Sequence, residues 1–253
     1  MSYVKRISEI RANDFSLVGG KGANLGELSG LGIRIPQGFC ITTEAYRDFI
    51  GGGLQNEIIE VAEALDCKRM DQVHAASNVI RGWILEKKVD EKILTEILTT
   101  YAQFNKVPVA VRSSATAEDL PNASFAGQHD SFLNVIGEDD LVDAILRGWA
   151  SLWTPRAIAY RGRHDFDLQK LAMGLVVQPM IQSDTSGVLF TVDISEGESS
   201  RMLINATYGQ GEALVSGSVT PDTFLVGRDE LDILEARPGN KVFRLDCAQF
   251  GGL

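Results

Sequence analysis

The apolar pattern divides this chain into a helical first part and a strand-rich last third, and this division constrains the fold most. Residues 54–104 carry apolar side chains at helical spacing, as Leu54, Ile58 and Val61 do. Beyond residue 172 the pattern changes to short apolar runs separated by Gly, Ser or Asp, which is typical of strands. Helices early and strands late favour an α+β fold with two lobes over an alternating doubly wound sheet.

The pattern also predicts where the elements lie. We expect a first lobe over 1–181, with a helical insert at about 54–104, and a second lobe over 182–253. Val79, Trp83 and Leu85 mark the second helix of the insert. Other helices are expected at 24–31, 44–50, 138–153 and 155–164. Strands are expected at 39–42, 107–111, 132–135, 172–181, 187–192, 201–206 and 223–226.

Composition excludes several classes of protein. The 253 residues carry 24 basic and 34 acidic side chains, so the net charge is 24 − 34 = −10. Such a charge disfavours non-specific binding to nucleic acid or to an anionic membrane. No window approaches 18 apolar residues, and the N-terminus lacks the apolar region of a signal peptide. Cys40, Cys67 and Cys247 are odd in number and widely spaced, which predicts reduced thiols and a cytoplasmic protein.

The first candidate for chemistry is Lys21, which lies in Gly19-Gly20-Lys21-Gly22. Glycines let a backbone approach a ligand closely, and a lysine beside them supplies a point charge for a phosphate. The segment is not a Walker A loop, because that motif requires Ser or Thr directly after its lysine. A plain turn that starts a helix is the alternative interpretation.

The second candidate is Arg112, which is expected to end the strand at 107–111 and to lead into the small hydroxyl residues Ser113 and Ser114. That arrangement suits phosphate recognition, whereas the alternative is a surface arginine at a turn. A polar loop at 113–128 follows and carries Phe125. It is interpreted either as a lid over a ligand or as a loop whose Phe125 packs in the core.

Three further patterns in the sequence bear on ligand binding. Pro179 ends the run from Val176 to Ile181, which can leave backbone groups free for an adenine edge; a simple strand end is the alternative. The glycines at 209–211 lack the third glycine of a dinucleotide fingerprint, so a turn-rich connection is favoured there. The histidines show no zinc-ligand spacing; they are His74, His129 and His164.

Taken together, these segments resemble the ATP-binding domain of the family of phosphoenolpyruvate synthase (pyruvate, water dikinase) and rifampicin phosphotransferase. The resemblance extends from about residue 15 to 245, with the motifs in order. The matching motifs are VGGKGANLGE at 18–27, PQGF at 36–39, VRSSATAED at 111–119, SFAGQ at 124–128, SGVLFT at 186–191, GQGE at 209–212 and GSVTPD at 217–222.

The resemblance implies an ATP-grasp fold, in which two lobes hold ATP with Mg²⁺. It assigns Lys21 and Arg112 to the triphosphate. By the same resemblance, Gln178, Pro179, Met180 and Ile181 form the adenine-binding hinge, and Ser124, Gly127 and Gln128 belong to a loop that covers the phosphates. In this family the β-phosphoryl group of ATP passes to a histidine on a separate swivelling domain, which leaves AMP and phosphate. That histidine then phosphorylates pyruvate or, in the phosphotransferase, the antibiotic.

The chain also departs from the family pattern. None of its histidines has the Thr- and Gly-rich context of the phosphorylated histidine, and the pyruvate-binding barrel is absent. Glu235-Ala236-Arg237-Pro238 resembles the family's magnesium segment, but the Gly239-Asn240-Lys241 that follows matches an earlier strand. We therefore expect a fragment that ends before the metal ligands, is inactive alone and belongs to a larger kinase. A stand-alone nucleotide-binding module is the alternative from another class. Pyruvate, phosphate dikinase is disfavoured because its covering loop is richer in methionine and glycine.

Overall fold

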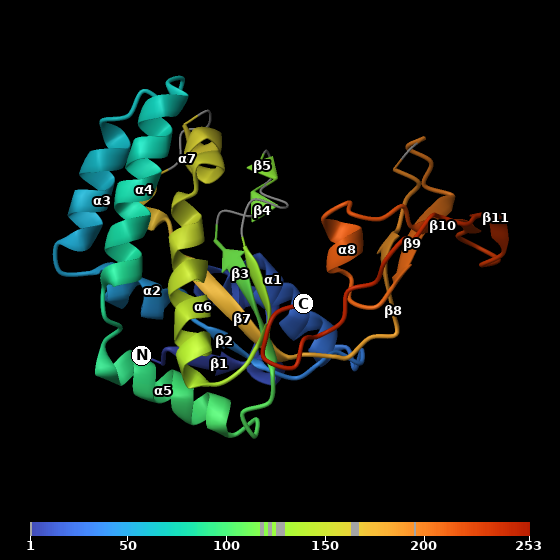
Figure 1. Cartoon of the computed structure of the whole chain (residues 1–253), viewed down its shortest axis with the longest axis horizontal. Helices are drawn as coiled ribbons and strands as arrows, with labels where there is room; N and C mark the ends of the chain where they lie inside the picture. Colours follow the sequence, from blue (N-terminus) through green and yellow to red (C-terminus); the bar gives the residue numbers. More distant parts are fainter. Residues whose placement is uncertain (1, 117–118, 121–122, 125–129, 163–166, 195) are drawn as a thin grey trace. The chain divides into compact units, whose positions relative to one another are not determined.

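The protein is described here in a computed structural model of the chain (Figure 1). The described residues are 2–116, 119–120, 123–124, 130–162, 167–194 and 196–253. The chain forms two compact units, Met1–Met180 and Ile181–Leu253. Helices concentrate in the first unit, and both units contain an antiparallel sheet. The predicted α+β class is therefore confirmed.

The helices and strands have the following bounds. The first unit contains β1 (Val4–Arg6), α1 (Phe15–Gly30), β2 (Phe39–Ile41), α2 (Thr43–Ile50), α3 (Leu54–Glu63), α4 (Met70–Glu86), α5 (Glu91–Ala102), β3 (Val109–Ala115), β4 (Asp119–Leu120), β5 (Ala123–Ser124), β6 (Ser131–Val135), α6 (Glu138–Ala150), α7 (Pro155–Arg161) and β7 (Met173–Pro179). Short 3-10 turns lie at Ile7–Glu9, Ala12–Asp14, Ser151–Trp153 and Leu168–Lys170. The second unit contains β8 (Thr185–Phe190), β9 (Arg201–Tyr208), α8 (Glu212–Val215), β10 (Asp222–Gly227) and β11 (Ile233–Arg237).

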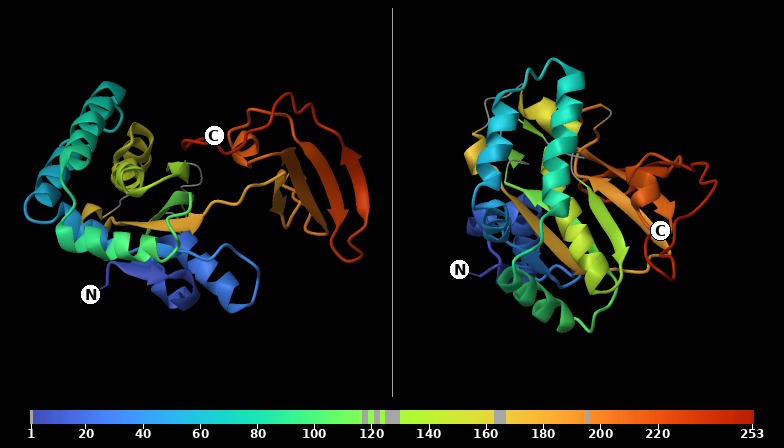
Figure 2. Two further views of the ribbon diagram at one scale, coloured as in Figure 1. Left: turned by 60° about the horizontal axis from the view of Figure 1, so that its bottom comes forward. Right: turned by 60° about the vertical axis from the view of Figure 1, so that its left-hand side comes forward.

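The sheet of the first unit separates two apolar cores. Its strand order is β1-β2-β7-β3-β6, and every neighbouring pair is antiparallel. Because side chains alternate along a strand, Val111 and Leu175 face the larger core, whereas Val176 belongs to the smaller one. Figure 2 shows the blue α1 and the yellow-green α6 on opposite sides of this sheet, in agreement with their contacts to β3 and β7.

The helical insert is present as α3, α4 and α5, and α4 contains the expected Val79, Trp83 and Leu85. Ile80 and Ile84 of α4 are buried, whereas Val79 and Leu85 are 45% and 39% exposed. Each helical residue turns about 100° from the one before it, so positions 79 and 85 rotate away from the buried stripe that contains 80 and 84. The expected Val79 and Leu85 mark the helix correctly but lie outside its packing face.

Two of the tryptophans pack in the larger core of the first unit. Trp149 is fully buried, and its ring centroid lies 4.7 Å from that of Phe49 and 6.2 Å from that of Tyr46. Trp153 Nε1 donates a hydrogen bond of 3.1 Å to the Tyr46 hydroxyl. Burial raises the pKa of Tyr46 to about 12. This aromatic cluster joins α2 to α6 and to the turn that follows α6.

The second unit is a four-stranded antiparallel sheet in the order β11-β10-β9-β8. Lys241 is nearly buried in it: its ammonium pairs with the Asp222 carboxylate and lies 5.4 Å from the centre of the Tyr208 ring. That pairing lowers the pKa of the Asp222 carboxyl group.

In the part of the chain that the structure describes, none of the helices has the length and apolar character needed to span a membrane.

The burial of the cysteines leads to a first prediction. All three thiols are free; Cys40 is buried, whereas Cys67 and Cys247 are half-buried. Burial raises the pKa of Cys40 to about 12, which removes the reactive thiolate at neutral pH. We expect Ellman's reagent at pH 8 to modify two thiols in the folded chain and the third only after denaturation. Rapid modification of all three in the folded chain would contradict the placement of Cys40.

Candidate functional site

The glycine segment around Lys21 lies inside a helix. We expected a loop followed by a helix at 24–31, but α1 already begins at Phe15 and runs through all four glycines from Gly19 to Gly26. Its regular path is broken only at Gly19, whose φ of 72° and ψ of 177° are not helical. The segment is therefore a kinked helix, and Lys21 lies in the first turn after the kink.

The kink rests on the middle of the sheet. Ser114 of β3 and Gly174 of β7 are paired in register, and α1 crosses them at Val18 and Gly19. A Cβ atom at Gly19 would lie 2.1 Å from the Ser114 carbonyl oxygen, and one at Gly174 would lie 2.8 Å from the Val18 oxygen. Neither distance is compatible with a side chain, so both glycines are required by close approach.

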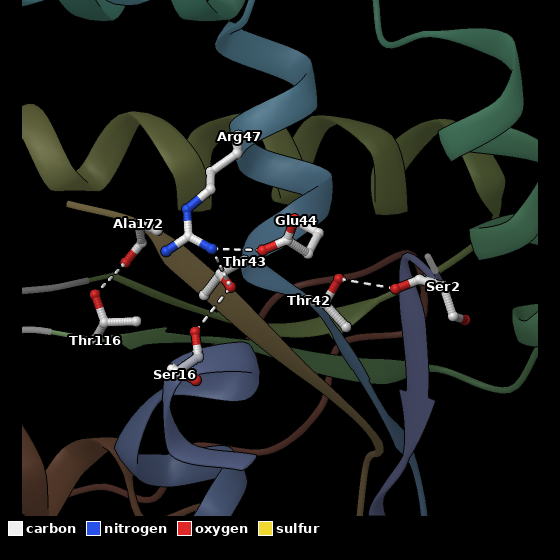
Figure 3. Close-up of polar contacts among 8 residues, drawn as sticks. All are labelled: Ser2, Ser16, Thr42, Thr43, Glu44, Arg47, Thr116 and Ala172. Carbon is white, nitrogen blue, oxygen red and sulfur yellow. Dashed lines mark hydrogen bonds and ion pairs between the residues drawn. The ribbon is translucent and has the colours of Figure 1, made fainter. Parts of the chain in front are cut away.

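Side-chain hydrogen bonds fix the elements around the kink (Figure 3). Thr43 Oγ1, at the start of α2, donates to the Ser16 carbonyl oxygen at 2.9 Å. Arg47 Nη1 in turn lies 2.5 Å from Glu44 Oε1 and 3.3 Å from Thr43 Oγ1. The bond from Thr43 holds the first turn of α1 against α2, and the Arg47 contacts lie within α2.

Arg112 lies within β3 and does not end the strand as we expected. The ladder between β3 and β7 continues to Ala115, so Ser113 and Ser114 are strand residues and not part of a loop. Their hydroxyl groups serve neighbouring backbone: Ser113 Oγ donates to Asp130 O at 2.9 Å, and Ser114 Oγ accepts from Gly22 N at 3.1 Å. The strand continues because β7 still offers pairing partners there.

The structure brings Arg112 and the Lys21 turn to the same face of the sheet. Ser114 contacts α1, and Arg112 lies two residues before it on the same side of β3, about 7 Å along the strand. Arg112 is exposed, and its side chain forms no hydrogen bond or ion pair within the described part of the chain. The guanidinium group is thus available for an anionic ligand beside the turn that carries Lys21.

Several polar groups of the expected hinge segment form hydrogen bonds within the protein. Gln178 is buried, and its Nε2 donates to Pro36 O at 2.7 Å, so its side chain anchors the turn before β2. Met180 N–H donates to Pro108 O at 2.9 Å, and Ile181 O accepts from Gln210 Nε2 at 2.8 Å. Within the described residues, Met180 C=O and Ile181 N–H form no hydrogen bond. Those two groups are the ones left for an adenine edge.

Of the remaining expected site residues, the structure describes Ser124 but not Gly127 or Gln128. Ser124 is paired with Asp119 in the two-stranded ladder of β4 and β5. Phe125, Gly127 and Gln128 lie outside the described residues. The glycines at 209–211 form the turn between β9 and α8, in agreement with the favoured interpretation, and Gln210 N–H donates to Leu245 O at 2.7 Å.

Sequence reasoning missed how the site is supported. It grouped Ser114 with a phosphate-binding loop, although its hydroxyl binds the backbone of α1. It gave no role to Gly174, which makes room for the kink. The adjacent serines of the VRSSA motif are a sequence signal, but only the strand register shows which serine faces α1.

Comparison with known proteins identifies the family. Residues 15–251 match the family described as the AMP/ATP-binding domain of pyruvate phosphate dikinase. This chain belongs to that family. It is 44% identical over 248 residues to a probable phosphoenolpyruvate synthase of Methanothermobacter thermautotrophicus. This alignment covers 95% of this chain and 36% of the relative. It is 38% identical over 272 aligned positions to the phosphoenolpyruvate synthase of Pyrococcus furiosus, covering 92% of this chain and 33% of that protein.

The chain spans about a third of the length of these curated relatives. An AMP/ATP-binding domain is therefore the part of the longer enzymes that this chain matches. The resemblance inferred from the glycine, arginine and SGVLFT motifs is confirmed.

Proposed function

We propose that this chain is the ATP-binding domain of a phosphoenolpyruvate synthase-like dikinase with an ATP-grasp fold. The β-phosphoryl group of ATP would pass to a histidine on a separate domain of the parent protein and then to pyruvate. Water releases the γ-phosphoryl group as phosphate, so the whole cycle would convert ATP, pyruvate and water to AMP, phosphate and phosphoenolpyruvate. Family membership and the similarity to phosphoenolpyruvate synthases support the proposal.

The observation that carries the proposal is the pairing of two cationic positions on one sheet face. The turn of Lys21 is bonded to β3 through Ser114, and Arg112 lies on the same side of that strand. Phosphoryl transfer requires positioning and neutralisation of charge more than covalent chemistry by the protein. We assign both side chains to the triphosphate, and we assign the backbone C=O of Met180 and N–H of Ile181 to adenine.

The proposal includes Mg²⁺, which would bind together with the phosphates of the nucleotide. In phosphate sites Mg²⁺ is held by one or two carboxylates together with the phosphates of the substrate. The described residues contain no group of three or more His, Cys, Asp or Glu side chains that could hold a metal ion by itself.

Binding can be tested on the chain itself. We expect MgATP to raise the melting temperature, because a ligand that binds only the folded state stabilises it by about 2.7 kcal/mol at a hundred times its Kd. Lys21→Ala and Arg112→Ala should each abolish most of this shift while the unliganded melting temperature changes little. Lys68→Ala, an exposed lysine of the helical insert, is the matched control and should keep the full shift.

Turnover needs the full-length parent protein. We expect it to release AMP from ATP in the presence of pyruvate and not of rifampicin, and we expect Lys21→Ala or Arg112→Ala to abolish this release. Release that depends on rifampicin would instead identify an antibiotic phosphotransferase. ATP binding without AMP formation would favour a nucleotide-binding module.

A further inference from the structure

The kink of α1 creates a helix start that lacks its own cap. The first N–H groups of a helix have no partner one turn back, and a Ser, Thr, Asn or Asp at the cap position accepts from the second or third of them. The residue at the cap position of the second segment of α1 is Gly19, which has no side chain. The chain therefore needs an acceptor from elsewhere.

Ser114 supplies that acceptor from β3. Gly22, the third residue after Gly19, donates its N–H to Ser114 Oγ at 3.1 Å, and Ser114 is fully buried. A Cβ atom at Gly19 would lie 2.5 Å from the same Oγ. A capping side chain at position 19 and the serine hydroxyl thus exclude each other, and the strand serine takes over the role of the missing cap.

We propose that Ser114 is a positioning residue for the triphosphate site. It acts through the Gly22 amide and holds the turn of Lys21 on the strand that carries Arg112. Lys21 lies between two fixed points, the close contact of Gly19 with β3 and the hydrogen bond of Gly22. Such fixation reduces the ordering that binding must otherwise supply. The inference rests on the proposed function, because it assumes that Lys21 contacts the nucleotide.

The test compares two ligands and two serines. Ser114→Ala removes the acceptor, and calorimetric titration should show MgATP binding weakened about tenfold, with adenosine affinity unchanged within about twofold. Adenosine carries no phosphate, so a site-specific effect must discriminate between these ligands. Ser77→Ala is the matched control: Ser77 is equally buried in α4, and its hydroxyl donates to Trp153 O at 2.7 Å. We expect this control to lower the melting temperature without changing either affinity.

The outcomes separate the inference from the proposed function. If the unmutated chain fails to bind MgATP, both are overturned. If it binds and Ser114→Ala binds equally well, or loses both ligands equally, only the positioning role is overturned. Should Ser114→Ala not fold, Ser114→Cys keeps the volume but offers a weak acceptor, and the same loss confined to MgATP is expected. In the unmutated chain, fast hydrogen exchange of the Gly22 amide would also contradict the proposal.

Discussion

Gly19→Ala is expected to cause a large loss of stability. An alanine Cβ would lie 2.1 Å from the Ser114 carbonyl oxygen and 2.5 Å from its hydroxyl, and Gly19 also has a φ of +72°. The helix must lift off β3 or the strand must move. We expect a loss of about 3 kcal/mol or more in the free energy of unfolding. In a chain of this size that corresponds to a fall of roughly 10 °C in the melting temperature.

Gly32→Ala is the control that isolates the steric contribution. Gly32 has nearly the same φ, +74°, but a Cβ there meets nothing within 4 Å. It should show only the cost of a left-handed backbone, about 1–2 kcal/mol. Thermal or denaturant unfolding of both variants checks the prediction. Equal losses would show that the contact between Gly19 and Ser114 does not limit stability. MgATP binding should fall in Gly19→Ala and remain in Gly32→Ala.

Trp149→Ala is expected to have a comparable effect through the core. The indole is fully buried against Phe49 and Tyr46, so its removal leaves a large cavity between α6 and α2. Truncation of a buried aromatic side chain costs about 3–5 kcal/mol. Denaturant unfolding followed by circular dichroism measures the loss, since the remaining tryptophans complicate a fluorescence signal.

Two phenylalanine variants refine this prediction. Trp149 Nε1 is buried with no hydrogen-bond partner among the described residues, whereas Trp153 Nε1 donates to the Tyr46 hydroxyl. Trp149→Phe therefore removes an unpaired polar group, but Trp153→Phe removes a buried hydrogen bond. We expect Trp153→Phe to destabilise the chain more than Trp149→Phe. The reverse order would contradict the assigned partners of the two indoles.

The pattern of apolar residues predicted element types well because periodicity reports directly which faces are buried. The helices at 54–104 and the late strands at 201–206 and 223–226 were placed to within a few residues. The sequence does not show which face of α4 packs, because Val79 and Leu85 are as apolar as Ile80 and Ile84. Only contact with the neighbouring helices decides which apolar stripe is buried.

The candidate site also divides into features that the sequence determined and features that only the tertiary structure decided. By itself, the sequence determined that Lys21 and Arg112 lie in glycine- and serine-rich surroundings, and the ordered motifs determined the family. The tertiary structure decided that the glycines lie inside a kinked helix and that Ser114 faces that helix while Ser113 faces away from it. The physical reason is that a close approach of two backbones joins residues 92 positions apart, from Gly22 to Ser114. No local pattern around either residue records that contact.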